Sequence, residues 1–131
     1  MSDSKYFYGV GRRKACTARA KVYDGANLEV IVNGKKLEDY FPAYYQATIT
    51  EMLEKVEASS VRIELFIRGG GLTGQSDAAR LAIANALLKK DDAAYRPTIR
   101  QHDYNTTDIR KVLPKQPGKP KARKSRQWVK R

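Results

Sequence analysis

The sequence predicts one small α+β domain over residues 1–108, followed by a long extended basic tail over residues 109–131. Apolar and polar residues alternate in several segments, which is typical of half-buried strands. Two other segments carry apolar residues at helical spacing. A chain of 131 residues has room for one hydrophobic core. We therefore expect a mainly antiparallel sheet packed by two helices.

The first predicted elements are strands. "ACTARAKVY", residues 15–23, alternates cleanly between apolar and polar positions. "DGAN" supplies a turn, and "LEVIVNG" is a second strand that ends at Asn33-Gly34, a pair that favours a hairpin. "KKLEDYF" then favours a short helical turn. No strand is predicted before residue 15, where the chain has a short polar start.

The first predicted helix begins near Pro42, because proline is tolerated in the first turn of a helix. It should continue to about Glu57 with one apolar face. The apolar residues at helical spacing are Tyr45, Ile49, Met52, Leu53 and Val56.

The clearest strand is "VRIELFIR", residues 61–68, and a glycine turn follows it. We expect Ser76 to cap the next helix, with Asp77 in its first turn, and the helix to run to Lys90. Its many alanines indicate close packing on a sheet. Asp91 and Asp92 should then be ionised in a polar loop, and "RPTIRQHDY" reads as a brief helical turn.

Charge is distributed unevenly along the chain. The formal net charge is +12, from 26 Lys/Arg and 14 Asp/Glu. Residues 110–131 hold ten of the basic residues and no acid, so the other 109 residues carry only +2. Such an asymmetry indicates a polyanionic partner, most often nucleic acid. Prolines and a glycine between 114 and 120 prevent a continuous helix, so we expect the tail to order on its partner.

The sequence shows no recognisable combination of catalytic residues. Cys16 is the only cysteine, which excludes an intramolecular disulfide and a cysteine-cluster zinc site. His102 is the only histidine, so no two-histidine metal site can form. No nucleophile is paired with an evident base. We expect no enzyme activity, no cofactor, no metal and no small-molecule substrate. We also expect no membrane segment or targeting peptide, and a reducing compartment.

The glycine turn admits several interpretations. Gly69, Gly71 and Gly74, with Asp91, fit the spacing of a dinucleotide fingerprint, but no strand precedes the acid. "GGGLTGQS" fits a P-loop except that Gln75 replaces its lysine, which removes the charge that meets the phosphates. Two interpretations stay open. The glycines serve only to turn the chain, or their backbone N–H groups bind a phosphate of RNA with the help of Arg68.

A second basic element lies near the N-terminus. Arg12, Arg13 and Lys14 precede the first predicted strand, and Gly9 and Gly11 would let the backbone approach another surface closely. The alternative is a cluster of solvated charges. In the tail, Trp128 is expected to stack on a base or sugar, or to anchor in an apolar pocket of a neighbour.

These motifs together resemble those of the small-subunit ribosomal protein nine family in its bacterial form. The segments are "YGVGRRKACTARAKVYDG", "VNGKKLEDYFP", "IRGGGLTGQSDAARLAIANALL", "RPTIRQHDY" and "KARKSRQWVKR". The resemblance implies a domain like the second domain of small-subunit ribosomal protein S-five, with a left-handed βαβ crossover. It also implies a place in the head of the small subunit among neighbouring head proteins, in a cytoplasmic rather than an organellar ribosome.

The resemblance further implies contacts to ribosomal RNA (rRNA) and to the transfer RNA (tRNA) in the peptidyl site. The expected rRNA-binding residues are Arg12, Arg13, Lys14, Arg68, Gly69, Gly70, Gly71, Thr73, Gly74, Gln75, Arg110, Lys111, Lys119, Lys121, Arg123 and Lys124. The expected tRNA-binding residues are Arg126, Trp128, Lys130 and Arg131. The tail departs from the family in "VLPKQPGKPKARKS", which is richer in proline, and in "QWVKR" at its end. The alternatives are a basic-tailed protein that condenses nucleic acid and a degenerate P-loop nucleotide binder.

Overall fold

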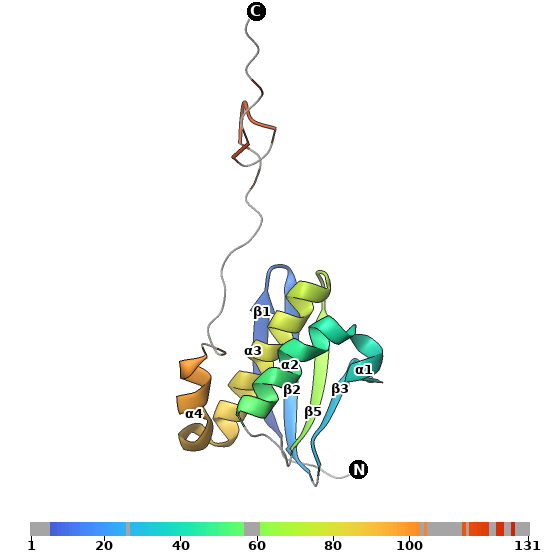
Figure 1. Cartoon of the computed structure of the whole chain (residues 1–131), viewed down its shortest axis with the longest axis vertical. Helices are drawn as coiled ribbons and strands as arrows, with labels where there is room; N and C mark the ends of the chain where they lie inside the picture. Colours follow the sequence, from blue (N-terminus) through green and yellow to red (C-terminus); the bar gives the residue numbers. More distant parts are fainter. Residues whose placement is uncertain are drawn as a thin grey trace, which may run out of the picture.

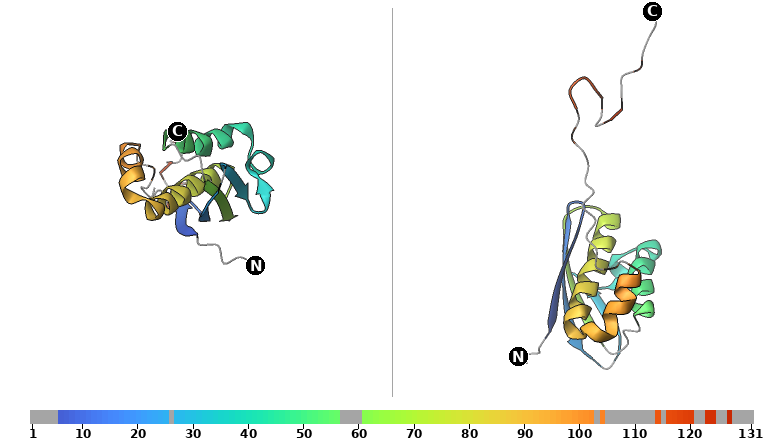
Figure 2. Two further views of the ribbon diagram at one scale, coloured as in Figure 1. Left: turned by 90° about the horizontal axis from the view of Figure 1, so that it is seen from below. Right: turned by 90° about the vertical axis from the view of Figure 1, so that its left-hand side faces the viewer.

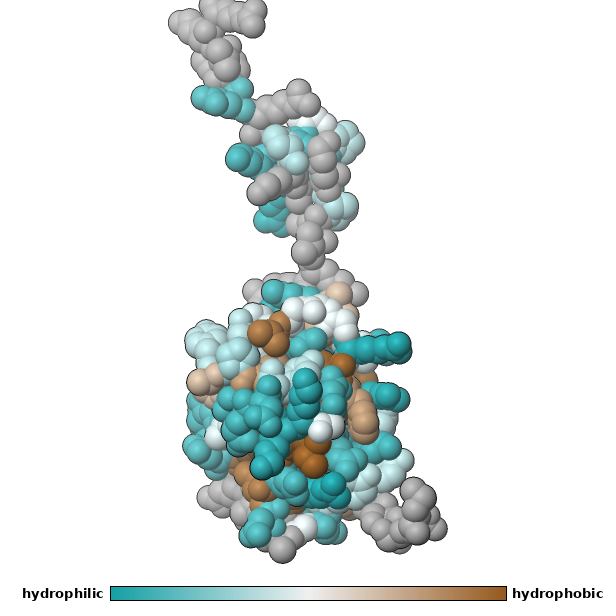
Figure 3. Space-filling model, turned by 90° about the vertical axis from the view of Figure 1, so that its right-hand side faces the viewer, coloured by the Kyte–Doolittle hydropathy of each residue, from teal (hydrophilic) through white to brown (hydrophobic). Residues whose placement is uncertain are grey.

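The computed structural model describes residues 6–25, 27–56, 61–102, 104, 114, 116–120, 123–124 and 127. These residues form one sheet with helices against one of its faces (Figures 1 and 2). The predicted α+β class is confirmed. On the side of the short helix and the hairpin edge, the surface is largely hydrophilic, with only scattered hydrophobic side chains (Figure 3).

The sheet has five strands in the described part of the chain, in the order β1-β2-β5-β3-β4. Their bounds are β1 Phe7–Arg13, β2 Cys16–Asp24, β3 Glu29–Val32, β4 Lys35–Lys36 and β5 Val61–Arg68. Three of the pairings are antiparallel, and β3 with β5 is parallel. The sheet is therefore mixed but mainly antiparallel, and β5 lies between β2 and β3.

The helices that the structure describes are α1 Leu37–Tyr40, α2 Ala43–Lys55, α3 Leu72–Lys90 and α4 Asp92–Gln101. The predicted short turn after the hairpin, the first long helix and the end of the second at Lys90 are confirmed. Helices α2 and α3 lie beside each other on the sheet, as expected, and α4 packs beside α3 (Figure 1).

The core lies between the sheet and these helices. Alternate residues of β2 from Cys16 to Val22, and of β5 from Val61 to Ile67, are buried, as the period-two pattern predicted. They meet the buried face of α2 and most of α3. Seven of the ten buried residues of α3 are glycine, serine or alanine. Small side chains allow α3 to approach the strands closely.

Strand β1 was missed by the sequence-based prediction. Its inward positions are Gly9 and Gly11, so the alternation of apolar and polar side chains is absent. A Cβ atom on Gly9 would lie 2.2 Å from the carbonyl oxygen of Ala82, and one on Gly11 would lie 2.1 Å from that of Ala78. The glycines are required because α3 crosses the backbone of β1 without space for a side chain.

The start of α3 also differs from the prediction. The helix begins at Leu72, and its N-cap is Gly71, five residues before the expected cap at Ser76. The Ser76 side chain is buried inside the helix, and its hydroxyl donates a hydrogen bond to the carbonyl oxygen of Thr73 at 2.9 Å. Glycine can cap a helix without a side chain, so the sequence held no capping signal there.

Helix α4 replaces the predicted polar loop and brief turn. The Asp91 side chain is its N-cap and accepts a hydrogen bond from the backbone N–H of Ala94 at 3.1 Å. Asp92 lies in the first turn and forms an ion pair with Arg96 at 2.7 Å, one helical turn away. Both signals were present in the sequence, but Pro97 within the helix concealed its length.

Two tight turns connect strands. The predicted hairpin at Asn33-Gly34 joins β3 to β4, and both residues have positive φ, 50° and 82°. Lys14-Ala15 joins β1 to β2, with Lys14 at a φ of 55°. The positive φ of Lys14 is the conformation that glycine usually supplies at the first position of such a turn.

The C-terminal end of the described domain is Tyr104, which is buried. Its backbone N–H donates to the carbonyl oxygen of Ile99 at 3.1 Å, and the guanidinium of Arg80 lies 5.4 Å from its ring centroid. The predicted boundary at 108–109 lies outside the described residues. No helix that the structure describes is long and apolar enough to cross a membrane.

Candidate nucleic-acid interface

The two motifs that the sequence analysis singled out lie together at one end of the sheet. Strand β2 is antiparallel to both β1 and β5, and Thr17, near its start, pairs with Arg12 and with Arg68. The turn before β2 and the glycine turn after β5 are therefore neighbours (Figure 1). Residues more than fifty positions apart in the chain form one surface, which we call the twin-turn end: residues 12–15 and 68–75.

Cys16 joins the two turns. Its thiol donates a hydrogen bond to the carbonyl oxygen of Gly69, with Sγ 3.0 Å from that oxygen. A Cβ atom on Gly70 would lie 2.0 Å from Sγ, and one on Gly74 would lie 2.9 Å from it. Gly69 and Gly70 also have positive φ, 81° and 64°. Part of the glycine motif is thus structural, because it closes over the cysteine.

The thiol is held in its neutral form. Burial raises the pKa of Cys16 above its ordinary value, and the nearby Lys14 opposes that effect only in part. A neutral thiol can donate to the Gly69 carbonyl but is a poor nucleophile. Cys16 is thus a small buried residue at the start of β2.

Gly71 differs from its two neighbours in the motif, because a Cβ atom there would meet nothing within 4 Å. It is exposed, as are Leu72 and Thr73, and no side chain caps α3. The first turn of the helix carries no acidic residue. An uncapped helix start with free space before it leaves backbone N–H groups and a partial positive charge for an anion.

The side chains at the P-loop positions are turned to the protein. The Gln75 amide donates to the carbonyl oxygen of Gly69 at 3.2 Å, and its oxygen accepts from the Tyr40 hydroxyl at 3.1 Å. Ser76, at the position that holds the metal in a P-loop, is buried and bonded within the helix. This arrangement disfavours the nucleotide-binding interpretation.

The basic residues of the twin-turn end fall into two kinds. Arg12, Lys14 and Arg68 are exposed, and none has an ion pair with a carboxylate of the described chain. Arg13 is largely buried and pairs with Asp77 at 3.4 Å. Arg13 therefore joins β1 to α3, a role that the sequence alone did not indicate.

Aromatic side chains border the glycine turn on the side of α2. The Thr73 hydroxyl donates to the Tyr45 hydroxyl at 3.2 Å, and Tyr45 contacts Tyr44 edge to face. The Tyr44 side chain is 81% exposed. Tyr45 packs against the core, as its place on the apolar face of the predicted helix indicated, and Tyr44 is open to a partner.

The predicted tail residues are not brought to this surface by the described structure. Arg123 and Lys124 are exposed and Lys119 is half-buried. Arg110, Lys111, Lys121, Arg126, Trp128, Lys130 and Arg131 lie outside the described residues. Among the residues that are described, no group of His, Cys, Asp or Glu side chains could hold a metal ion.

Comparison with known proteins identifies the family. A family model described as "Ribosomal protein S9/S16" matches residues 11–131. The chain is 42% identical over 130 residues to the small ribosomal subunit protein uS9 of Porphyromonas gingivalis, covering 96% of this chain and 98% of that protein. It is 40% identical over 124 residues to uS9 of Azobacteroides pseudotrichonymphae, with 93% and 95% covered.

A mitochondrial protein, uS9m of Neurospora crassa, is 42% identical over 125 residues, which are 94% of this chain and 39% of that protein. The family match spans the whole twin-turn end, and it extends through the basic tail. The resemblance deduced from the motifs is thereby confirmed: the chain belongs to the ribosomal protein S9 family of the small ribosomal subunit.

Proposed function

We propose that the chain is a structural, non-enzymatic constituent of the small-subunit head, which binds rRNA through the twin-turn end and reaches the peptidyl-site tRNA with its tail. One observation carries the first part. Two motifs that are distant in the sequence converge on Cys16 and present Arg12, Lys14 and Arg68 beside an uncapped helix start. These are features that bind phosphate without reading bases.

The proposed contacts divide by chemistry. Arg12, Lys14 and Arg68 supply charge, while Gly71 and Thr73 lie at the start of α3, where backbone N–H groups can face a phosphate.

Gly70, Gly74 and Gln75 act indirectly, because they hold the turn on Cys16 and Gly69. Arg13 likewise acts through Asp77. The contact is thus positional and electrostatic.

The tail carries the rest of the proposed function. Its ten basic residues should neutralise roughly six to ten phosphates, so affinity for rRNA should fall about 10³–10⁵-fold between 50 and 200 mM salt. Arg110, Lys111, Lys119, Lys121, Arg123 and Lys124 are assigned to rRNA, and Arg126, Trp128, Lys130 and Arg131 to the tRNA. No specific observation favours the nucleic-acid-condensing alternative.

The twin-turn end is tested by measuring affinity for small-subunit rRNA as a function of salt. Arg12→Gln, Lys14→Gln and Arg68→Gln should each weaken binding and reduce the slope of log affinity against log salt by about 1. Arg96→Gln is the matched control, because that arginine is paired with Asp92 on α4. Equal slopes for all four variants would contradict the proposal.

The tail is tested by deleting Lys130 and Arg131. The truncated chain should fold and enter the small subunit as the full chain does, while tRNA dissociates faster from the peptidyl site. Filter retention of tRNA on assembled subunits measures this. Unchanged retention would remove the tRNA contact from the proposal and leave the rRNA contact standing.

We assign the chain to a bacterial-type cytoplasmic ribosome, because the two bacterial relatives match over nearly their whole length at 40–42% identity. Cell fractionation followed by sedimentation tests the assignment. The chain should sediment with cytoplasmic small subunits, and recovery in an organellar fraction would overturn it.

A further inference from the structure

One face of the sheet is not covered by any helix of the described chain. The helices that the structure describes lie on the opposite side, where α2 and α3 pack against the sheet and α4 packs beside α3 (Figure 2). The side chains that point to the open face are those at the alternate positions left out of the core. On the two central strands they are Thr17, Arg19, Lys21 and Tyr23 of β2, and Arg62, Glu64, Phe66 and Arg68 of β5.

A surface hollow lies on this open face, next to the glycine turn. Its lining includes Thr17, Arg19, Asn33, Phe66, Arg68 and Gly69, and no acidic residue. Phe66 is 38% exposed, whereas the apolar residues that alternate with it on β5 are buried. A large exposed aromatic ring in the middle of a sheet has no part in the core.

Cations surround the Phe66 ring. Arg19 is directly opposite Phe66 in the antiparallel register, and its guanidinium carbon is 5.7 Å from the ring centroid. The ammonium nitrogen of Lys21 is 5.4 Å from the same centroid and 4.9 Å from the centroid of the Tyr6 ring. These cation–π contacts fix the positions of the Phe66 ring and the Arg19 guanidinium. Both are flat surfaces on which another planar group can stack.

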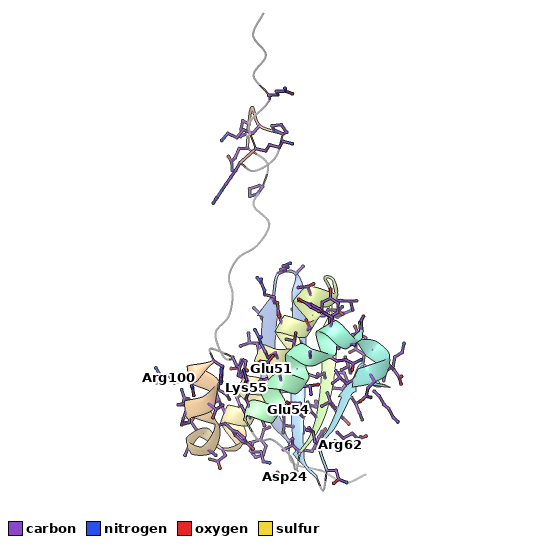
Figure 4. All side chains as sticks on the ribbon, in the orientation of Figure 1. Asp24, Glu51, Glu54, Lys55, Arg62 and Arg100 are labelled. Carbon is purple, nitrogen blue, oxygen red and sulfur yellow. The ribbon has the colours of Figure 1, made fainter. Side chains whose placement is uncertain are left out.

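Charge is divided along the open face. Arg62 lies at the end remote from the glycine turn (Figure 4) and is paired with Glu29 at 3.8 Å and Glu64 at 3.2 Å. Arg19 and Arg68, at the hollow, have no carboxylate partner in the described chain. The end with the hollow is therefore positive, and the other end is neutralised internally.

We propose that this hollow receives an unpaired nucleobase of RNA, stacked on Phe66 or on the Arg19 guanidinium, with Arg68 on the adjoining phosphate. The proposal rests on the rRNA-binding function above and adds Arg19, Lys21 and Phe66 to it. Aromatic rings and arginine planes are the usual stacking surfaces for splayed-out RNA bases. A protein partner would require a broader apolar centre than one exposed phenyl ring among cations.

A photo-crosslinking phenylalanine analogue at position 66 tests the occupant in assembled small subunits. We expect its crosslinks to fall on unpaired nucleotides of small-subunit rRNA. The same analogue in place of Leu28 is the control, since that side chain is 43% exposed but lies just before β3, at the far end of the sheet. Crosslinks from position 66 to a neighbouring protein, or to paired nucleotides only, would overturn the proposal.

Affinity for purified small-subunit rRNA provides the second test. Phe66→Leu should weaken binding about 5- to 150-fold, which is the range for one base stacked on an aromatic ring. Phe66→Tyr keeps an aromatic ring and should bind like the unmodified chain. Arg19→Gln should weaken binding, and Arg62→Gln, with its paired charge, should not. Thermal melting of each variant checks that the fold is retained.

The two proposals fail in different ways. If the unmodified chain binds rRNA without dependence on salt or on Arg12 and Lys14, the function of the twin-turn end is wrong. If salt-dependent binding persists while Phe66→Leu and Arg19→Gln bind like the unmodified chain, only the nucleobase site is wrong.

Discussion

The Asn33 side chain makes hydrogen bonds to both backbone polar groups of Ile67. Its carbonyl oxygen accepts from the Ile67 N–H at 2.8 Å, and its amide nitrogen donates to the Ile67 carbonyl oxygen at 3.1 Å. Asn33 follows the last residue of β3, so its side chain continues the ladder to β5 after the backbone has turned away. Ile67 is two residues before Gly69, and this contact therefore fixes where the glycine turn begins.

Two replacements of Asn33 should distinguish the contribution of its hydrogen bonds to stability from the contribution of its backbone conformation. Asn33→Ala should lower the free energy of unfolding by about 1–3 kcal/mol, because two backbone groups lose their partner. Asn33→Gly loses the same bonds but accepts the φ of 50°, so it should be about 1 kcal/mol less destabilised than the alanine variant. Urea denaturation measures both, and equal stability of Asn33→Ala and the unmodified chain would refute the role of the side chain.

The close approach of β1 to α3 predicts an unusual intolerance of alanine. Gly11→Ala should cost about 3 kcal/mol, since the new Cβ would lie 2.1 Å from a backbone oxygen that cannot rotate away. Gly71→Ala is the matched control in the glycine turn, with a φ of −104° and nothing near the new atom. Its cost should stay within about 1 kcal/mol. Denaturant midpoints that are similar for the two variants would contradict this packing.

The contact between Cys16 and Gly74 predicts a compensating pair of substitutions. Gly74→Ala should destabilise the chain, because its Cβ would lie 2.9 Å from Sγ. Cys16→Ala removes the sulfur, so Gly74→Ala should cost less in that background. A double-mutant cycle from unfolding free energies should show a coupling of about 0.5–3 kcal/mol. Additive effects of the two substitutions would mean that the sulfur does not set the closure of the turn.

Burial of the Cys16 thiol predicts the direction of a pH effect. The pKa is higher in the folded chain than in the unfolded chain, so the folded state retains the proton more firmly. The thiol's contribution is fully present below the ordinary pKa of a free cysteine, about 8.5, and is lost as pH rises toward the folded value. The unmodified chain should therefore lose stability relative to Cys16→Ala as the pH rises from 7 to 10.

Alkylation provides an independent check of the same burial. Iodoacetamide should modify Cys16 only as fast as the domain unfolds, and urea should accelerate the reaction steeply. Rapid modification of the native chain, or a stability difference that is constant with pH, would show that the thiol is accessible and that the turn is not closed over it.

Local patterns in the sequence determined the elements that have one buried face. Strands β2 and β5 follow the period of two, α2 follows the helical period, and the hairpin at Asn33-Gly34 follows from residues that accept positive φ. The family could also be identified from the sequence, because its motifs are contiguous stretches of chain. The uneven charge, too, is a property of composition alone.

Tertiary structure decided the features that depend on a distant partner. β1 is a strand because Gly9 and Gly11 accept the backbone of α3, and no local pattern reports that contact. Arg13 pairs with Asp77 of α3, and Arg19 lies beside the Phe66 ring on the open face. Both contacts join residues that are distant in the sequence. The twin turns meet because β2 is antiparallel to both β1 and β5. Periodicity records how each segment faces the core, but the pairing of segments depends on packing between residues far apart in the chain.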